Sequence, residues 1–172
     1  MTPSHDILAP ISLCVADANI LFDLRNGRIL MDIGALPYQF LVPDAVWAEL
    51  DTPLRSMVQR LGFEIGTLEA KAVSEIYALR PGHPQLSVAD LFALLVARDR
   101  QAVLLTGDIR LKKLAEIRGL VVHGTLWVLD ELFERQALNA QGALIALERI
   151  LALGGRLPSS ECQKRRILWQ GK

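Results

Sequence analysis

The sequence is poor in the two residue types that most often build disulfide or zinc frameworks. It has 2 cysteines and 3 histidines among 172 residues. Cys14 and Cys162 are far apart and indicate no disulfide framework, so a reducing, cytoplasmic environment fits. The histidines, His5, His83 and His123, lack the spacing of metal ligands, which argues against a zinc site.

Net charge and long apolar runs are also lacking. The 19 basic and 19 acidic side chains balance, so no overall positive charge attracts nucleic acid, although a local basic rim stays open. No apolar run is long enough to cross a bilayer, and the N-terminus lacks the basic region of a signal peptide. The usual dinucleotide, P-loop, serine-hydrolase and zinc motifs are absent. We therefore predict a protein without a membrane partner.

Strand-like and helix-like segments alternate along the chain, and the length suits one domain. After a short arm at 1–10, the pattern predicts strands at 11–16, 38–42, 63–65, 102–105 and 120–122. It predicts helices at 19–25, 44–50, 52–61, 68–79, 87–99, 109–118, 124–136 and 140–153, and a short helix or loop at 29–36. Such alternation is typical of an α/β fold with a mostly parallel sheet and helices on both faces. We place the domain at 1–155 and a C-terminal tail, with a basic cluster, at 156–172.

The stretch LCVADANILFDL, residues 13–24, places an acid between a buried strand and an apolar helix. Asp17 follows the strand, and no Lys or Arg occurs after it until Arg25. Ligands of open α/β sheets bind at the carboxyl ends of the strands. Because an unpaired buried charge is costly, this position indicates a bound cation.

Three further acids stand out by context: Glu49, Asp90 and Asp108. Asp108 ends the strand at 102–105 much as Asp17 ends the first, so these two acids converge if the strands are neighbours. Two like charges about 4 Å apart repel by roughly 4 kcal/mol at an effective dielectric near 20, so converging carboxylates need a cation or a proton. Oxygen ligands without His or Cys select Mg²⁺ or Mn²⁺. We predict all four acids as metal-binding and catalytic residues, with one ion or two left open.

Three of these acids also have a structural explanation. Asp108 can be the N-cap of the helix at 109–118. Ser87-x-x-Asp90 matches a capping box, and Glu49 can be a solvated helix residue. A cap does not exclude metal binding, but it removes the need for it.

Asp17 has the weakest structural alternative, because Asn19 is the better-placed cap of the helix that follows. The remaining acids of this kind fit helix faces or caps, with Asp44 as the N-cap of the helix to residue 50. They are Asp23, Asp44, Asp51 and Asp130.

The helix at 109–118 carries the basic residues Arg110, Lys112 and Lys113. Such a row is ordinarily a solvated helix face. Beside an acidic cleft it can instead contact the phosphates of RNA without reading sequence.

Several short motifs, in order, resemble those of the PIN-domain nucleases. The first strand runs into VADAN, and a Pro-x-x-Val-x-x-Glu segment follows at 43–49. A later helix opens with Leu-Ser-x-x-Asp at 86–90, a strand ends in Thr-x-Asp at 106–108, and VHGTL begins at residue 122. The resemblance covers about residues 11–153.

This resemblance implies a three-layer α/β/α, Rossmann-like fold and a Mg²⁺- or Mn²⁺-dependent endoribonuclease. The four acids would bind the metal, and the supporting polar side chains would be Asn19, Ser87 and Thr106. Many bacterial members are VapC-type toxins that form dimers and are held inactive by an antitoxin, so the resemblance implies a homodimer and a small antitoxin partner. Several members carry a further acid beside the last aspartate, where this sequence has Gly107 and Ile109, so one-ion chemistry or reduced activity stays open.

The leading hypothesis is the RNA-cleaving toxin of a toxin–antitoxin pair, with water activated by a metal on Asp17, Asp90 and Asp108 and with Glu49 as a further ligand or base. The alternative is a catalytically weak PIN-like module that binds RNA or a protein. A phosphohydrolase of the haloacid dehalogenase type needs an aspartate where Asn19 stands, which counts against it. The sequence leaves open the RNA target, the cut site and cleavage of DNA.

Overall fold

A five-stranded parallel sheet forms the centre of the structure, a computed structural model that describes residues 12–171. The strand order is β3-β2-β1-β4-β5. The predicted α/β fold with a parallel sheet is confirmed, and the predicted arm at 1–10 lies outside the described residues. The strands are β1 (Ser12–Ala16), β2 (Tyr38–Pro43), β3 (Glu64–Gly66), β4 (Val103–Leu105) and β5 (Val122–His123).

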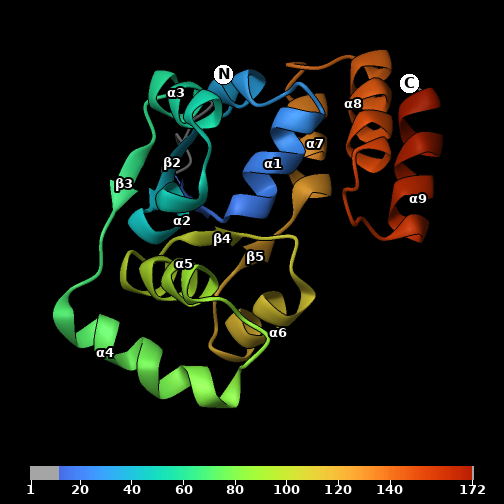
Figure 1. Cartoon of the computed structure of the whole chain (residues 1–172). Helices are drawn as coiled ribbons and strands as arrows, with labels where there is room; N and C mark the ends of the chain where they lie inside the picture. The colour runs from blue at the N-terminus through green and yellow to red at the C-terminus, as the bar shows by residue number, and fades with distance from the viewer. Residues whose placement is uncertain (1–11, 172) are drawn as a thin grey trace, which may run out of the picture.

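Helices cover both faces of this sheet, which gives the three layers that the resemblance implied. Figure 1 shows α4, α5 and α6 on one side and α1, α7, α8 and α9 on the other. The helices are α1 (Ala18–Asn26), α2 (Asp44–Glu49), α3 (Thr52–Arg60), α4 (Ala70–Leu79), α5 (Val88–Asp99), α6 (Ile109–Ile117), α7 (Thr125–Glu134), α8 (Ala140–Ala152) and α9 (Ser159–Gln170). Two short 3₁₀ segments, η1 (Met31–Ala35) and η2 (Arg80–Gly82), complete the described elements. Within residues 12–171, no helix combines the length and apolarity required to span a bilayer.

The strand order reverses between β1 and β4. These two strands lie side by side although they are far apart in the sequence. Their register pairs Ala16 with Leu105, so both strands end at the same edge of the sheet. In open α/β sheets the crevice beside such a reversal is where ligands bind.

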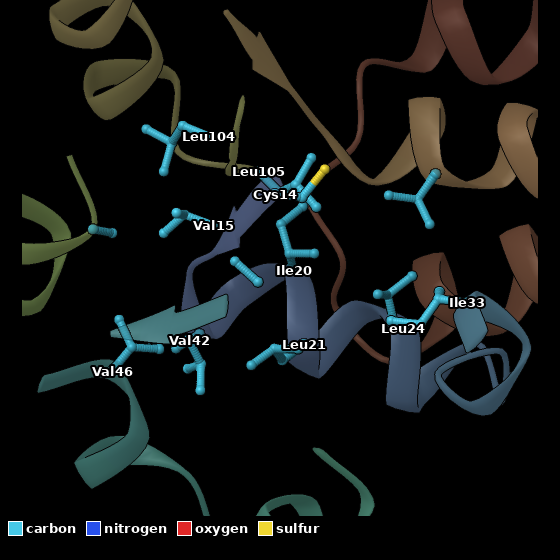
Figure 2. Packing of buried hydrophobic residues seen from close by; sticks show 14 of the residues in the cluster. Cys14, Val15, Ile20, Leu21, Leu24, Ile33, Val42, Val46, Leu104 and Leu105 are labelled. Carbon is cyan, nitrogen blue, oxygen red and sulfur yellow. The ribbon is translucent and has the colours of Figure 1, made fainter. Parts of the chain in front are cut away.

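The core is formed where β1 and α5 are buried on nearly every side. Cys14 and Val15 are fully buried in β1, as are most of the residues of α5. Figure 2 shows the α1 side of this core, where Ile20, Leu21 and Leu24 pack beside the strands. A parallel strand covered on both faces reads as a continuous apolar run, which is why LCVA and VLL are legible in the sequence.

Three local predictions differ from the structure. Asp17, rather than Asn19, is the N-cap of α1, and Asn19 is exposed. Pro43 takes the N-cap position of α2, while Asp44 is its first residue and accepts a hydrogen bond from the backbone N–H of Ala45. A cap is chosen by where the helix begins: α1 begins at Ala18, one residue earlier than predicted, and β2 continues to Pro43. The last strand also lies at 122–123 rather than 120–122.

The segment described from sequence as a tail contains helix α9, which packs against α8. Its basic cluster is used in ion pairs: Arg165 binds Asp130 of α7 at 2.6 Å, and Arg166 binds Glu148 of α8 at 2.7 Å. Trp169 is fully buried and lies against Phe133 of α7. Its apolar contacts were not visible in the sequence, because the pattern of α9 is weakly periodic.

Replacing Trp169 tests whether α9 is part of the folded core. Because truncating a buried Trp removes apolar contacts and leaves a cavity, we expect Trp169→Ala to lower the free energy of unfolding by about 3–5 kcal/mol. Urea denaturation followed by circular dichroism measures it. The control is Leu168→Ala, at a side chain that is 49% exposed. Equal, small losses in both variants would show that α9 is not packed as described.

Candidate active site

Asp17 lies at the centre of the candidate site, where β1 gives way to α1. Its side chain is only 1% exposed. Oδ1 accepts a hydrogen bond from the backbone N–H of Ile20 at 2.8 Å, and Oδ2 accepts one from the hydroxyl of Thr106 at 2.5 Å. The carboxyl group is therefore fixed at both oxygens, by the first turn of α1 and by the residue that follows β4.

Thr106 connects Asp17 to Asp108. Its Oγ1 accepts the backbone N–H of Asp108 at 3.0 Å and donates its own proton to Asp17. Since the N–H can only donate, the direction of the hydroxyl proton is set toward the carboxyl group. The predicted meeting of the two strand ends is confirmed, through a buried threonine that joins them.

Asp108 and Asp90 are both helix caps, as the structural alternatives proposed. Oδ1 of Asp108 accepts the backbone N–H groups of Arg110 and Leu111 at 2.7 and 3.0 Å. Asp90 and Ser87 form a complete capping box, in which Oδ2 of Asp90 accepts the N–H of Ser87 at 2.8 Å. In both aspartates, the other oxygen accepts no hydrogen bond from the described part of the chain.

The electrostatic field of this edge is negative. The pKa of Asp17 is raised to about 7, mainly by burial; the hydrogen bonds from Thr106 and Ile20 lower the pKa, and the charges of Asp90 and Asp23 raise it. Burial and the charge of Asp90 raise the pKa of Glu49 as well. The acids thus share one field, and no basic side chain compensates the buried Asp17.

The sequence matches the PIN-domain family over residues 13–170, nearly the whole chain. The chain belongs to the PIN-domain family. PIN domains are in general metal-dependent nucleases. No protein with a curated description matches this sequence.

Solved structures similar to this PIN domain include two prokaryotic proteins. One is VapBC2 from Rickettsia felis bound to a DNA fragment from their promoter, with 20% identity, a TM-score of 0.46, and coverage of 65% of this chain and 98% of that one. The other is a PilT N-terminus domain protein from the hyperthermophilic archaeon Sulfolobus solfataricus P2, with 15% identity, a TM-score of 0.48, and coverage of 71% and 94%.

The donor groups of this PIN domain suit a hard cation, but the side chains do not form a closed cage. Among residues 12–171, no three His, Cys, Asp or Glu side chains are placed so that they could hold a metal ion. The caps explain this, because Asp90 and Asp108 each direct an oxygen to the start of a helix. An all-oxygen set around a buried carboxyl group of raised pKa still fits Mg²⁺ or Mn²⁺ chemically, since such a group needs a proton or a cation.

Sequence reasoning missed a second pair of a carboxyl and a hydroxyl group in the PIN domain, between partly buried Asp23 and buried Thr125. The hydroxyl of Thr125, fully buried at the start of α7, donates to Oδ2 of Asp23 at 2.7 Å. Burial raises the pKa of Asp23. The available signal was the polar Gly-Thr that follows β5, in the same position as the polar residues after β1 and β4.

The other predicted site residues lie at the surface around these acids. Asn19, Glu49 and Ser87 are exposed, as are Arg110, Lys112 and Lys113 of α6. Lys112 pairs weakly with Glu116 at 3.8 Å. Two hollows of about 380 and 320 Å³ lie at the amino ends of the strands, lined by Tyr38 and Val103 among others. They are therefore at the opposite end of the sheet from the acids.

Asp17→Asn tests the burial of this charge in the metal-free protein. The pKa of Asp17 is about 7 in the folded state and 3.8 ordinarily. Between these two pH values the folded state therefore binds more protons than the unfolded state. The protonated carboxyl group makes its whole contribution to the free energy of unfolding at pH values below the unfolded-state pKa. This contribution is lost as the pH rises through the folded-state pKa. Asn does not ionise, so we expect the variant to be more stable than wild type by on the order of 2 kcal/mol at about pH 8.

Urea denaturation with a chelator present, from about pH 4 to about pH 8, measures this difference. The gain should shrink as pH falls, because the wild-type carboxyl becomes protonated. If the variant were less stable than wild type by the same amount at every pH, Asp17 would be needed as a hydrogen-bond acceptor, and its charge would not destabilise the folded protein.

Proposed function

We propose that this PIN domain is a Mg²⁺- or Mn²⁺-dependent endoribonuclease. Asp17, Asp90 and Asp108 would hold the metal, with Glu49 as a further ligand or general base. The observation that carries the proposal is Asp17, a 1% exposed carboxyl group at a strand reversal with other acids as its charged neighbours. Burying an ionised carboxyl group there costs free energy when no metal is bound, and a bound cation removes this cost.

The chain's own residues prepare the site for phosphodiester hydrolysis. Thr106 fixes the orientation of Asp17, and the two capping aspartates keep one oxygen each without a protein partner. Glu49 is exposed and its pKa is raised, which suits a group that accepts a proton from an attacking water. A divalent ion bound there would supply Lewis-acid polarisation of the phosphate and favour formation of the nucleophile.

The form of the site supports a polymer as the substrate. The acids lie at an open edge, away from the two hollows at the amino ends of the strands. Arg110 and Lys113 of α6 are exposed and, within the described chain, have no acidic partner. Basic side chains beside an acidic site suit the phosphates on either side of a cut.

The resemblance carries two further parts of the proposal. We propose that the protein acts as the toxin of a toxin–antitoxin pair, and that it binds a small antitoxin and forms a homodimer in the cytoplasm. Co-expression with the protein encoded next to it, followed by size-exclusion chromatography with light scattering, tests both. A lone monomer that is harmless to the producing cell would contradict this part and leave the nuclease proposal standing.

The second candidate function is a PIN-like module that binds RNA or protein without cutting. One observation favours it: among residues 12–171 the acids form no ready group of three that could hold a metal ion. The two functions differ in whether a divalent ion binds at all.

Calorimetry with Mn²⁺ and an RNA cleavage assay on the same samples separate them. We expect wild type to bind and cleave, and Asp17→Asn and Asp108→Asn to lose both, because each removes a charged ligand. The matched control is Glu134→Gln, an exposed acid of α7 that has no ion pair among the described residues. Negligible binding in all four proteins would overturn the nuclease and favour the binding module.

Charge removal on α6 tests the path of the RNA. Each phosphate contact contributes about 0.7 to the slope of log affinity against log salt for a single strand. We therefore expect Arg110→Ala/Lys113→Ala to reduce that slope by about 1.4. The control removes the same charge elsewhere, with Arg60→Ala/Lys71→Ala on α3 and α4. Equal changes in both double variants would show that α6 has no particular role.

A further inference from the structure

Glu49 is the last residue of a helix that is too short to be stable without contacts to the rest of the protein. Helix α2 has six residues, Asp44–Glu49. The last carbonyl groups of any helix lack helical partners, and a helix of this length is not stable by itself. Burial of Val46 and Leu50 attaches one side of α2 to the core, and the backbone N–H of Leu50 donates to the carbonyl oxygen of Trp47 at 3.2 Å.

Arg55 of the next helix, α3, donates further hydrogen bonds to two carbonyl groups at this end. Its Nε donates to the carbonyl oxygen of Trp47 at 3.1 Å, and its Nη2 donates to that of Ala48 at 3.0 Å. Its guanidinium carbon also lies 5.5 Å from the centre of the Trp47 ring. One planar group thus fixes both residues that directly precede Glu49.

Glu49 itself has no ion pair within residues 12–171, and the described chain gives its carboxyl group no hydrogen bond. Helix α2 packs against α5, the helix that carries Asp90. The negative charge of Asp90 repels that of Glu49 and helps to raise the pKa of Glu49. The carboxyl group therefore keeps its place beside Asp90 through the contacts that hold the end of α2, which are the burial of Val46 and Leu50 and the hydrogen bonds of Arg55. Among these contacts, Arg55 is the one polar side chain that binds the carbonyl groups directly before Glu49 in the described chain.

We propose that Arg55 is a positioning residue, which holds Glu49 beside Asp90 by clamping the C-terminus of α2. The proposal rests on the function proposed above, since it assigns Glu49 a role in that site. Lysine cannot replace the clamp, because its single ammonium group lacks the planar fork that reaches two carbonyl groups while stacking on an indole ring.

The first test needs no metal and no activity. In the metal-free protein, ¹³C NMR follows the titration of the Glu49 carboxyl group. Asp90→Asn should lower its midpoint, because a neighbouring negative charge is removed. In an Arg55→Met background this shift should disappear, and in an Arg60→Met background, on the same helix, it should persist. An equal shift in the Arg55→Met background would overturn the proposal.

The second test is Mn²⁺ calorimetry on a double-mutant cycle. Groups that orient metal ligands typically change affinity by 10–100-fold when removed, so we expect Arg55→Met to weaken binding by about 10-fold, and Arg55→Lys to resemble it. Arg55→Met/Glu49→Gln should bind no more weakly than Glu49→Gln alone. Losses that multiply in the double variant would overturn action through Glu49. A wild type that does not bind Mn²⁺ would contradict the proposed function, and the NMR test alone would then decide the role of Arg55.

Discussion

Three of the helices that begin at the carboxyl edge of the sheet have a carboxylate in their N-terminal cap, where it accepts backbone N–H groups. Asp17 caps α1, Asp108 caps α6, and Asp90 completes the capping box of α5. A helix N-terminus carries about half a positive elementary charge, which stabilises a nearby anion. These N-termini offset the repulsion among acids that the parallel strands bring together. The fold can therefore gather carboxylates at one edge and still be stable.

The same contacts leave oxygens free for the metal-binding role that we propose for these acids. A carboxylate has two oxygens, and the caps at Asp90 and Asp108 use one oxygen of each. Asp17 differs, because both of its oxygens are hydrogen-bonded and its side chain is buried. Thr106 makes this possible by accepting from Asp108 and donating to Asp17. The buried threonine thus couples the ends of two strands that are distant in sequence.

Much of this arrangement could be predicted, and the exceptions have physical reasons. The acids at two strand ends and the capping box were legible because each is a local pattern beside an apolar run. The cap of α1 was misassigned to Asn19, because α1 begins at Ala18, directly after Asp17, and its start cannot be read from the apolar pattern to within one residue. The Asp23–Thr125 pair was missed because the residues lie about a hundred positions apart. Helix α9 was missed because it is held by contacts with α7 that lie far away in sequence: the ion pair of Arg165 with Asp130 and the packing of Trp169 on Phe133.

The sequence by itself determined the alternation of strands and helices, the parallel sheet, the PIN-domain motifs and the identity of the acids. These follow from periodicity and from side-chain chemistry within a few residues. Only the tertiary structure decided which oxygens are used by helix caps, that Thr106 joins Asp17 to Asp108, and that Arg55 holds the end of α2. Such contacts depend on which strand ends and helix ends meet in space, and no local pattern encodes their distances.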